Sequence, residues 1–329
     1  MRAVQATAFG TPDVLQLSEL PDPQPGPGEI SIDVTHAAVG LIDVFVRQGL
    51  YKDVPGMPQP AFIPGLEVTG TVRALGEGVT AFRVGERVVS MSRGGTGGYA
   101  EIYLAAATSV VSIEGFDIDP ALAVSVIPNA AMAHAALTAV AHLTAGERVL
   151  VHGALGGFAA AFPGIAQTLG AAEVIGSVRA SKLDAARAST LPYDRIIDSA
   201  HLLAELAGEK FDVIIDAVGG EVRTASLDLL NPGGRIILAG NASEQWDHSL
   251  DSNQLWLRSI TVSGFNSGAY LPTHPHLIRP ALEAARAAVA AGLGDVEVEV
   301  LPLSAATEAH RRMESREVAG RLVLSTRPR

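Results

Sequence analysis

Cysteine is absent from the 329-residue chain, and aromatic residues make up only 5% of it. Without cysteine there is no disulfide framework, no thiol nucleophile and no cysteine-ligated zinc site. Charged residues are few, at 18%, whereas apolar residues reach 48%. This balance supplies enough apolar surface for a folded core and excludes global disorder. The length fits two domains, or one large one.

Positive charge is also in short supply, because 24 lysine and arginine residues stand against 35 aspartate and glutamate residues, a formal net charge of −11. The average surface therefore repels polyanions, and nucleic acid is not an expected partner. The N-terminal sequence lacks the apolar run of a signal peptide. The longest apolar stretch, around residues 130–140, is interrupted by His134 and falls short of the ~18–20 residues that span a bilayer. We expect a cytoplasmic protein without a membrane partner.

Short segments rich in β-branched residues characterise residues 1–120. Ile30–Val34, Val68–Ala74 and Arg87–Ser90 are examples, and glycine- and proline-rich stretches separate them. Pro21–Glu29, for instance, suits neither a helix nor a central strand. Short strands at close spacing predict a small barrel or sandwich in this part of the chain.

Apolar strands alternate with helical segments after Asp119. The predicted strands are Arg148–Gly153, Val174–Val178, Arg195–Asp198, Asp212–Val218, Arg235–Gly240 and Ser259–Phe265. They are apolar throughout, as parallel strands covered on both faces are. Strand–helix alternation at this spacing predicts an α/β fold with a doubly wound parallel sheet of the Rossmann type.

A glycine-rich turn joins the first of these strands to a helix within Val149–Phe162. Such a turn brings backbone close to a pyrophosphate, and the helix start offers N–H groups to it. Gly156, Gly157, Phe158 and Ala159 are therefore candidate cofactor contacts. The alternative is a turn without a ligand, because alanine occupies two of the three positions where glycine is usual. Pro163 predicts a kink or a late helix start, since it lacks the N–H that would bond to the carbonyl of Ala159.

The end of the second strand indicates which dinucleotide is bound. NAD sites place an acid about 20 residues after the glycines, to bind the ribose 2′-hydroxyl. Here Ser177, Arg179 and Lys182 occupy this region, with no acid before Asp184. A hydroxyl and two cations suit a 2′-phosphate, so NADPH is favoured over NADH. The alternative is that both cations are a solvated helix start, although cations there oppose the helix dipole.

Seven segments, spread over essentially the whole chain, resemble the zinc-independent quinone oxidoreductase branch of the medium-chain dehydrogenase/reductase superfamily. They are Asp43–Tyr51, Ile63–Val79, Gly98–Ile102, Gly146–Gly157, Asp216–Gly220, Leu230–Ser243 and Glu314–Leu324. The resemblance implies a GroES-like β-barrel catalytic domain, built from residues 1–120 and 266–329, around a Rossmann dinucleotide-binding domain at residues 121–265.

The resemblance also implies the absence of a catalytic metal. Leu66 stands where zinc-dependent relatives have a histidine ligand, and the cysteine ligand is missing. His274 and His276 are the remaining pair of candidate ligands. Two histidines need at least one further ligand, so a solvated loop is the favoured interpretation.

The family's site residues carry over to several positions of this chain. Tyr51 and Asp43 match the segment beside the substrate, as candidate catalytic residues. Tyr51 is expected to donate to a substrate carbonyl, to stack on a quinone ring or to be a wall residue without a chemical role. Asp43 is expected to act there or to tie the loop to a backbone N–H. The remaining cofactor candidates are Gly240 and Asn241 near the nicotinamide ribose, Phe265 and Asn266 near the carboxamide, and Arg316 near the phosphates or simply on the surface.

The chain departs from the family pattern at Gly40, where asparagine is usual, and within Asn129–Ala133, where threonine is usual. Both changes predict a more apolar pocket. The favoured function is NADPH-dependent hydride transfer to a small-molecule quinone or other α,β-unsaturated carbonyl. The alternatives are an enoyl-thioester or polyketide-intermediate reductase, and a catalytically silent NADPH-binding protein. The resemblance further implies a homodimer that pairs Ser259–Phe265 across a two-fold axis.

Overall fold

A computed structural model of the chain describes residues 1–91, 96–294, 296–316, 318 and 320–327. Glu317 and Ala319, inside the last of the seven family segments, lie outside this description. The chain forms two compact units. The first comprises Met1–Pro128, Ser267–Ala290 and Val296–Arg329, and the second comprises Asn129–Asn266 and Ala291–Asp295. The first boundary lies inside helix α2 (Pro120–Ala135), whose first residues belong to the first unit and whose last residues belong to the second.

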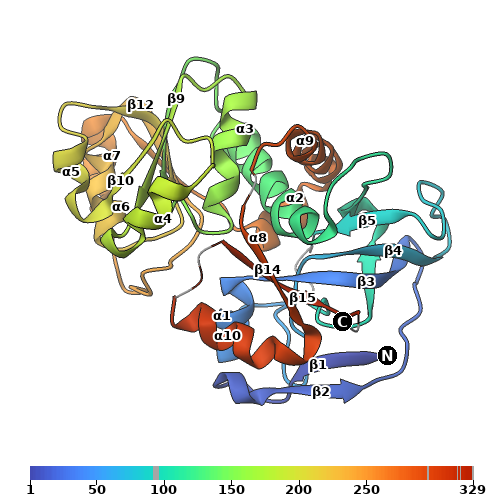
Figure 1. Cartoon of the computed structure of the whole chain (residues 1–329). Coiled ribbons are helices and arrows are strands. Elements are labelled where there is room, and N and C mark those ends of the chain that lie inside the picture. Colours follow the sequence, from blue (N-terminus) through green and yellow to red (C-terminus); the bar gives the residue numbers. More distant parts are fainter. Residues whose placement is uncertain (92–95, 295, 317, 319, 328–329) are drawn as a thin grey trace. The chain divides into compact units, whose positions relative to one another are not determined.

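The second unit holds a parallel sheet whose described strands run in the order β10–β9–β8–β11–β12–β13 (Figure 1). The strands are β8 (Arg148–His152), β9 (Glu173–Val178), β10 (Arg195–Asp198), β11 (Phe211–Asp216), β12 (Leu230–Leu238) and β13 (Thr261–Gly264). The chain therefore starts at the centre, moves to one side, and returns to build the other side. This confirms the predicted doubly wound sheet, in which ligands bind beyond the carboxyl ends of the strands at the central switch point.

Short helices connect these strands. They are α3 (Phe162–Thr168), α4 (Leu183–Ala188), α5 (Leu202–Glu205), α6 (Glu221–Leu227) and α7 (Ser252–Arg258), with 3-10 turns at Ala159–Ala161, Ala180–Lys182 and Ser199–His201. The core of the unit comes from the strands, since Leu150, Ile175, Ile214 and Ile236 are fully buried. Burial on both faces is the reason that these strands are apolar throughout.

The first unit is built around β3 (Glu29–Val39), which pairs antiparallel with three other strands, β4, β6 and β15. Its described strands are β1 (Arg2–Ala6), β2 (Leu15–Glu19), β3, β4 (Val68–Leu75), β5 (Arg87–Ser90), β6 (Ile102–Ala106), β7 (Val110–Ser112), β14 (Val298–Pro302) and β15 (Arg321–Ser325). Strand β15 comes from the C-terminal end of the chain and lies beside β3 (Figure 1). Both ends of the sequence therefore contribute to one unit.

The helices of the first unit are α1 (Leu41–Gln48), the first part of α2, α8 (Ser267–Thr273), α9 (Ile278–Ala290) and α10 (Ala306–Glu314), with 3-10 turns at Pro12–Val14, Ala107–Ser109, Pro275–Leu277 and Leu303–Ala305. Helix α1 lies in a region that sequence analysis assigned to strands and turns. Its local signals are clear in retrospect: the Asp43 carboxylate accepts from the N–H of Gly40, and Gly49 ends the helix at φ +79°.

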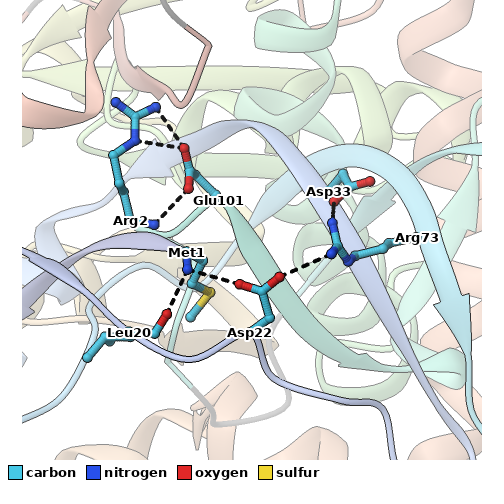
Figure 2. A network of polar contacts seen from close by, with 7 residues as sticks. All are labelled: Met1, Arg2, Leu20, Asp22, Asp33, Arg73 and Glu101. Carbon is cyan, nitrogen blue, oxygen red and sulfur yellow. Dashed lines mark hydrogen bonds and ion pairs between the residues drawn. The ribbon is translucent and has the colours of Figure 1, made fainter.

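A polar network fixes the start of the chain to the first unit (Figure 2). The amino group of Met1 donates to the carbonyl of Leu20 at 2.6 Å and to Asp22 at 2.9 Å. Asp22 also pairs with Arg73 at 3.1 Å. The two ion pairs of Asp22 are exposed, so each contributes little free energy.

The apolar segment after Asp119 is longer in the structure than the sequence suggested. Helix α2 continues into a π-helical turn at Ala136–Val140, and the resulting 21-residue helix is apolar enough in length and composition to cross a membrane. This corrects the expectation that no segment reaches that length, because His134 does not interrupt the helix. Since 72% of its most apolar window is buried inside the structure, it has the properties of a core helix.

Candidate dinucleotide site

The glycine turn lies directly after β8, at the carboxyl edge of the parallel sheet. Gly153 adopts φ +72°, and its N–H and that of Ala154 both donate to the carbonyl of Ser177, at 2.9 and 3.0 Å. The N–H of Gly156 donates back to the carbonyl of Gly153 at 2.7 Å. The turn is therefore closed on itself and fastened to the end of β9.

Two donors in this turn are available to a ligand. Among the described residues, the N–H groups of Gly157 and Phe158 donate to no protein acceptor. The Phe158 ring packs edge-on against Phe162, with ring centroids 4.9 Å apart. Unpaired N–H groups ahead of a helix suit an anion such as a pyrophosphate. The turn thus fits the predicted role of Gly156 to Ala159, although alanine replaces two of the usual glycines.

The helix after the turn begins late, which confirms the expected effect of Pro163. Residues Ala159–Ala161 form a 3-10 turn, and α3 begins at Phe162. The hydroxyl of Tyr193 donates to the carbonyl of Ala159 at 2.9 Å and lies 3.3 Å from that of Ala154. No local sequence pattern predicts this hydrogen bond, because Tyr193 lies in the loop before β10.

Close packing beneath the turn requires Gly176 on β9. A Cβ at this position would lie 2.6 Å from the Cβ of Ala154 and 3.2 Å from the Tyr193 ring. The glycine turn and the loop before β10 therefore approach the sheet closely at β9. A glycine inside an otherwise apolar strand was the available sequence signal for this contact.

Of the three residues predicted for a 2′-phosphate, Ser177 points elsewhere. It is fully buried, and its hydroxyl lies 2.7 Å from Nδ1 of His152. That hydroxyl is thus used inside the unit. Arg179 is exposed and Lys182 half-buried, and the pKa of Lys182 is lowered by burial and by the nearby Arg179 guanidinium. Two cations this close favour an anion between them.

A cavity of about 580 Å³ opens at this end of the site. It lies beyond the carboxyl ends of β9 and β10 and beside the start of α6. Its lining comprises Arg179, Ala180, Ser199, Ala200, His201, Leu202, Leu203, Ala204, Glu221, Val222 and Ala225. Mixed apolar and polar walls with a cation at the rim suit the adenosine end of a dinucleotide.

A buried acid organises the loop between β11 and α6. Asp216 is fully buried, accepts from the N–H groups of Val218 and Gly219 at 2.9 and 2.8 Å, and pairs with Nε of Arg223 at 2.5 Å. Arg223 also donates to the carbonyl of Gly240 at 2.8 Å. Sequence analysis did not single out this pair; an aspartate at the end of an apolar strand, followed by two glycines, was the signal that was available.

The predicted nicotinamide contacts adjoin this loop. Asn241 lies against Gly219, where an added Cβ would come within 2.3 Å of its side-chain oxygen. Phe265 is buried and donates its N–H to the carbonyl of Leu238 at 2.9 Å, and Asn266 is exposed. The second unit therefore brings Gly240 and Asn241 to the β11–α6 loop and places Phe265 just past β13.

The first unit holds the other candidates, Asp43, Tyr51 and Arg316. Asp43 is buried and accepts from Gly40 N–H at 2.8 Å, Gly65 N–H at 3.2 Å and the Tyr99 hydroxyl at 3.3 Å. Burial raises the pKa of Asp43 to about 6, and these bonds oppose the rise. The contacts are those of a residue that ties loops together. Tyr51 is half-buried, which raises the pKa of its phenol, and Arg316 adopts φ +58°.

A second buried carboxylate, Glu67, accompanies Asp43 and was missed by sequence analysis. Its pKa rises to about 7, through burial first and the charge of Asp43 second, while the Arg321 guanidinium opposes the rise. Arg321 is itself buried, and burial lowers its pKa. Glu67 directly follows Leu66, so it occupies the segment in which zinc-dependent relatives carry a ligand.

Among the described residues, no group of three or more histidine, aspartate or glutamate side chains is arranged to hold a metal ion. The two loop histidines considered from the sequence pack with an aromatic ring instead. His274 stacks on Tyr270 with ring centroids 4.0 Å apart, and the rings of His274 and His276 are 6.1 Å apart.

Comparison with known proteins gives the family. A model described as an alcohol dehydrogenase GroES-like domain matches residues 26–115, and one described as a zinc-binding dehydrogenase matches residues 169–324. A quinone oxidoreductase of Lama guanicoe is 35% identical over 258 residues, 73% of this chain and 73% of that protein. One of Pseudomonas aeruginosa is 30% identical over 335 residues, 98% and 99% respectively. The chain belongs to the medium-chain dehydrogenase/reductase superfamily.

Within this superfamily of oxidoreductases, the chain is similar to the quinone oxidoreductases. A synaptic vesicle membrane protein VAT-1 homolog of Danio rerio is 28% identical over 348 residues, 99% of this chain and 70% of that protein. A mycobacterial protein solved with NADPH is 30% identical with a TM-score of 0.84, and the Escherichia coli quinone oxidoreductase solved with NADPH is 26% identical with 0.83. Each match covers 99% of this chain and 100% of the other. This medium-chain dehydrogenase/reductase thus has the predicted Rossmann and GroES-like domains.

Proposed function

We propose that this protein is an NADPH-dependent reductase of quinones or other α,β-unsaturated carbonyl compounds. The observation that carries the proposal is the pair of cations, Arg179 and Lys182, where β9 ends beside the 580 Å³ cavity. An NAD site would have an acid at this point for the ribose 2′-hydroxyl. The names of the similar proteins, quinone oxidoreductases of 30–35% identity, support the substrate class.

The residues present fit such a cofactor along the whole carboxyl edge of the sheet. The N–H groups of Gly157 and Phe158 would hold the pyrophosphate, and the two cations would hold the 2′-phosphate. The segments around Asn241 and Phe265 would meet the nicotinamide end. When bound, the reduced nicotinamide supplies a hydride to an electron-poor carbon of the substrate.

The protein's own part in the reaction is to stabilise, with a hydrogen-bond donor, the negative charge that develops on the substrate oxygen. Burial raises the pKa of Tyr51, so its phenol stays protonated at neutral pH and is a hydrogen-bond donor. Donors aimed at a developing oxyanion stabilise the transition state. Asp43 contributes by holding the loops that begin at Gly40 and Gly65. The proton that completes the reaction comes from water or from Tyr51.

A parallel fluorescence titration with NADPH and NADH tests the cofactor. The wild-type protein is expected to bind NADPH at least tenfold more tightly, and Arg179→Ala to lose most of that preference. Arg187→Ala is the matched control, because this exposed arginine pairs with Asp184 on the helix that follows. Equal affinity for both dinucleotides would contradict the assignment of the 2′-phosphate site.

Turnover of a substrate panel tests the reaction. Quinones and simple enones are expected to be reduced faster than enoyl thioesters. The reverse order would favour an enoyl-thioester or polyketide-intermediate reductase. NADPH binding without turnover of any activated alkene would favour the catalytically silent alternative.

We further propose that the protein is a homodimer that uses the β13 edge. Among the described residues β13 pairs on one side, with β12, and the other side is an open edge. Helix α7, directly before β13, exposes 70% of Trp256 and 62% of Leu257. Open edges and large exposed apolar side chains favour self-association. Sedimentation is expected to give a dimer that Trp256→Glu weakens; a monomer at micromolar concentration would overturn the proposal.

A further inference from the structure

A fully buried histidine, His152, ends β8 immediately before the glycine turn, and the proposed reaction makes no use of it. Its two ring nitrogens each lie 2.7 Å from a serine hydroxyl. Nδ1 faces Ser177 on β9, and Nε2 faces Ser226 on α6. Both serines are also fully buried. The imidazole therefore spans three elements of the second unit.

The direction of each hydrogen bond can be assigned from the network. The hydroxyl of Ser226 donates to the carbonyl of Val222 at 2.6 Å, which uses its single hydrogen. Nε2 of His152 must then carry a hydrogen and donate to Ser226, so Nδ1 is the acceptor of the Ser177 hydroxyl. Every polar atom of the three side chains is satisfied by a neutral imidazole. Burial lowers the pKa of His152 to about 4, which agrees with that charge state.

Each end of this network is bonded to a segment that faces the dinucleotide in the proposed function. The carbonyl of Ser177 accepts the N–H groups of Gly153 and Ala154, which open the glycine turn. Ser226 lies one turn after Arg223, which binds Asp216 and the carbonyl of Gly240. One rigid ring thus links the pyrophosphate turn to the loop that adjoins the nicotinamide contacts.

We propose that His152 is a positioning residue for the dinucleotide: it holds the glycine turn, the end of β9 and helix α6 at fixed spacing. Donors at the turn and cations beyond β9 then meet the pyrophosphate and the 2′-phosphate of one ligand without reorganisation. Preorganisation of this kind raises affinity because the protein does not have to order the loops on binding. The inference rests on the proposed NADPH-binding function.

Three substitutions test the role. His152→Leu keeps much of the volume and removes both polar atoms. Ser226→Ala removes the acceptor of the Nε2 hydrogen. His152→Gln restores one acceptor and one donor. We expect the Kd for NADPH to rise about tenfold in His152→Leu and about threefold in Ser226→Ala, and to stay within about twofold of wild type in His152→Gln.

Ser125→Ala is the matched control. Ser125 is a buried helix serine of the first unit whose hydroxyl donates to the carbonyl four residues earlier, at 2.7 Å, as Ser226 does. It is expected to lower the unfolding temperature as Ser226→Ala does, with no effect on the Kd. In turnover assays the KM for NADPH should follow the Kd while kcat at saturation stays constant.

The outcomes separate this inference from the function on which it rests. If the wild-type protein binds neither NADPH nor NADH, the proposed function falls and the inference falls with it. If the wild type binds NADPH and Ser226→Ala changes only the unfolding temperature, the inference alone is overturned. Because Ser226→Ala is a small truncation, it decides the question even if His152→Leu does not fold. A KM for NADPH that is higher in His152→Leu and returns to the wild-type value in His152→Gln would support the positioning role.

Discussion

The hydroxyl of Tyr193 donates to the carbonyl of Ala159 at 2.9 Å, and this is the carbonyl that Pro163 leaves without its helical N–H partner. The N–H of Phe162 also bonds to it, in the tighter 3-10 geometry. A departure from the usual helix sequence at position 163 is therefore offset by a side chain from the loop before β10. Although α3 begins late, the backbone that follows the glycine turn is still held by the Tyr193 hydroxyl.

Removing this hydroxyl tests the relationship. Tyr193→Phe is expected to lower the free energy of unfolding by about 1 kcal/mol, because the carbonyl of Ala159 loses a part-buried donor. In the Pro163→Ala background, where a helical N–H is restored, the same substitution should cost less. Chemical denaturation of the wild type, the two single variants and the double variant gives the coupling free energy between the two positions. A coupling of zero would show that the two residues act independently.

Substitution of Gly176 should destabilise the glycine turn through a steric clash. Gly176→Ala places a Cβ 2.6 Å from the Cβ of Ala154, so the turn must shift. We expect a loss of about 1–3 kcal/mol in unfolding free energy and weaker dinucleotide binding. Gly264→Ala, on another parallel strand, is the control, because a Cβ there meets no atom within 4 Å. Equal stability of the two variants would contradict the predicted close approach.

The buried carboxylate Glu67 predicts an unusual pH dependence. Its pKa is raised to about 7, so between about pH 4.5 and 7 the folded state holds a proton that the unfolded state has lost. Stability from this group is therefore present at low pH and falls as the pH rises through 7. Glu67→Gln should remove this slope and be more stable than wild type at pH 8, by up to about 3 kcal/mol.

The buried histidines also make stability depend on pH, because their lowered pKa values give a slope of the opposite sign below pH 6.5. Their contribution is the same in Glu67→Gln and in the wild type, so it cancels when the two are compared. Glu147→Gln is the contrasting control. The pKa of Glu147 is lowered, chiefly by its bond to Arg235, so its contribution is present at neutral pH and lost on acidification. At pH 8 the change in unfolding free energy should thus have opposite signs for the two variants. The gain in Glu67→Gln should be small by pH 5, whereas the loss in Glu147→Gln should shrink only as the pH falls below about 4.5. Denaturation curves between pH 8 and pH 4 check both changes.

Replacing a buried arginine of the first unit should lower the free energy of unfolding far more than replacing an exposed one. Arg47 is fully buried, donates to the carbonyl of Gly10 at 3.0 Å and pairs with Glu314. Arg47→Ala leaves that carboxylate with only the Gln48 amide as a partner, removes the donor to the Gly10 carbonyl, and should cost about 3 kcal/mol or more. Arg311→Ala, which breaks an exposed pair with Glu308 three residues away, should cost under about 0.5 kcal/mol. Urea denaturation distinguishes the two.

Tyr51→Phe tests the proposed chemistry. Loss of a donor to a developing oxyanion is expected to lower kcat about 10- to 100-fold on quinones and enones, with little change in the KM for NADPH. An unchanged kcat across several enones would leave Tyr51 as a wall of the pocket. Single-turnover measurements confirm that the chemical step is the one affected.

Local sequence determined the parallel sheet with good accuracy. The bounds of β10 are those expected, and β8 and β9 differ by one residue at one end. The reason is physical: a strand buried on both faces must be apolar throughout, and polar or glycine residues end it. The effect of Pro163 is also local, because the hydrogen bond that it removes would join two residues only four positions apart.

Tertiary structure decided what those local patterns left open. Ser177 was expected at a phosphate because it lies near Arg179 in the sequence, but pairing of β9 with β8 turns its side chain toward His152. Tyr193 and Ser226 gain their roles from chain segments 34 and 74 residues away. The sequence by itself set which elements form and where the glycine turn lies. Which side chains meet depends on strand register and helix packing, contacts that no local pattern encodes.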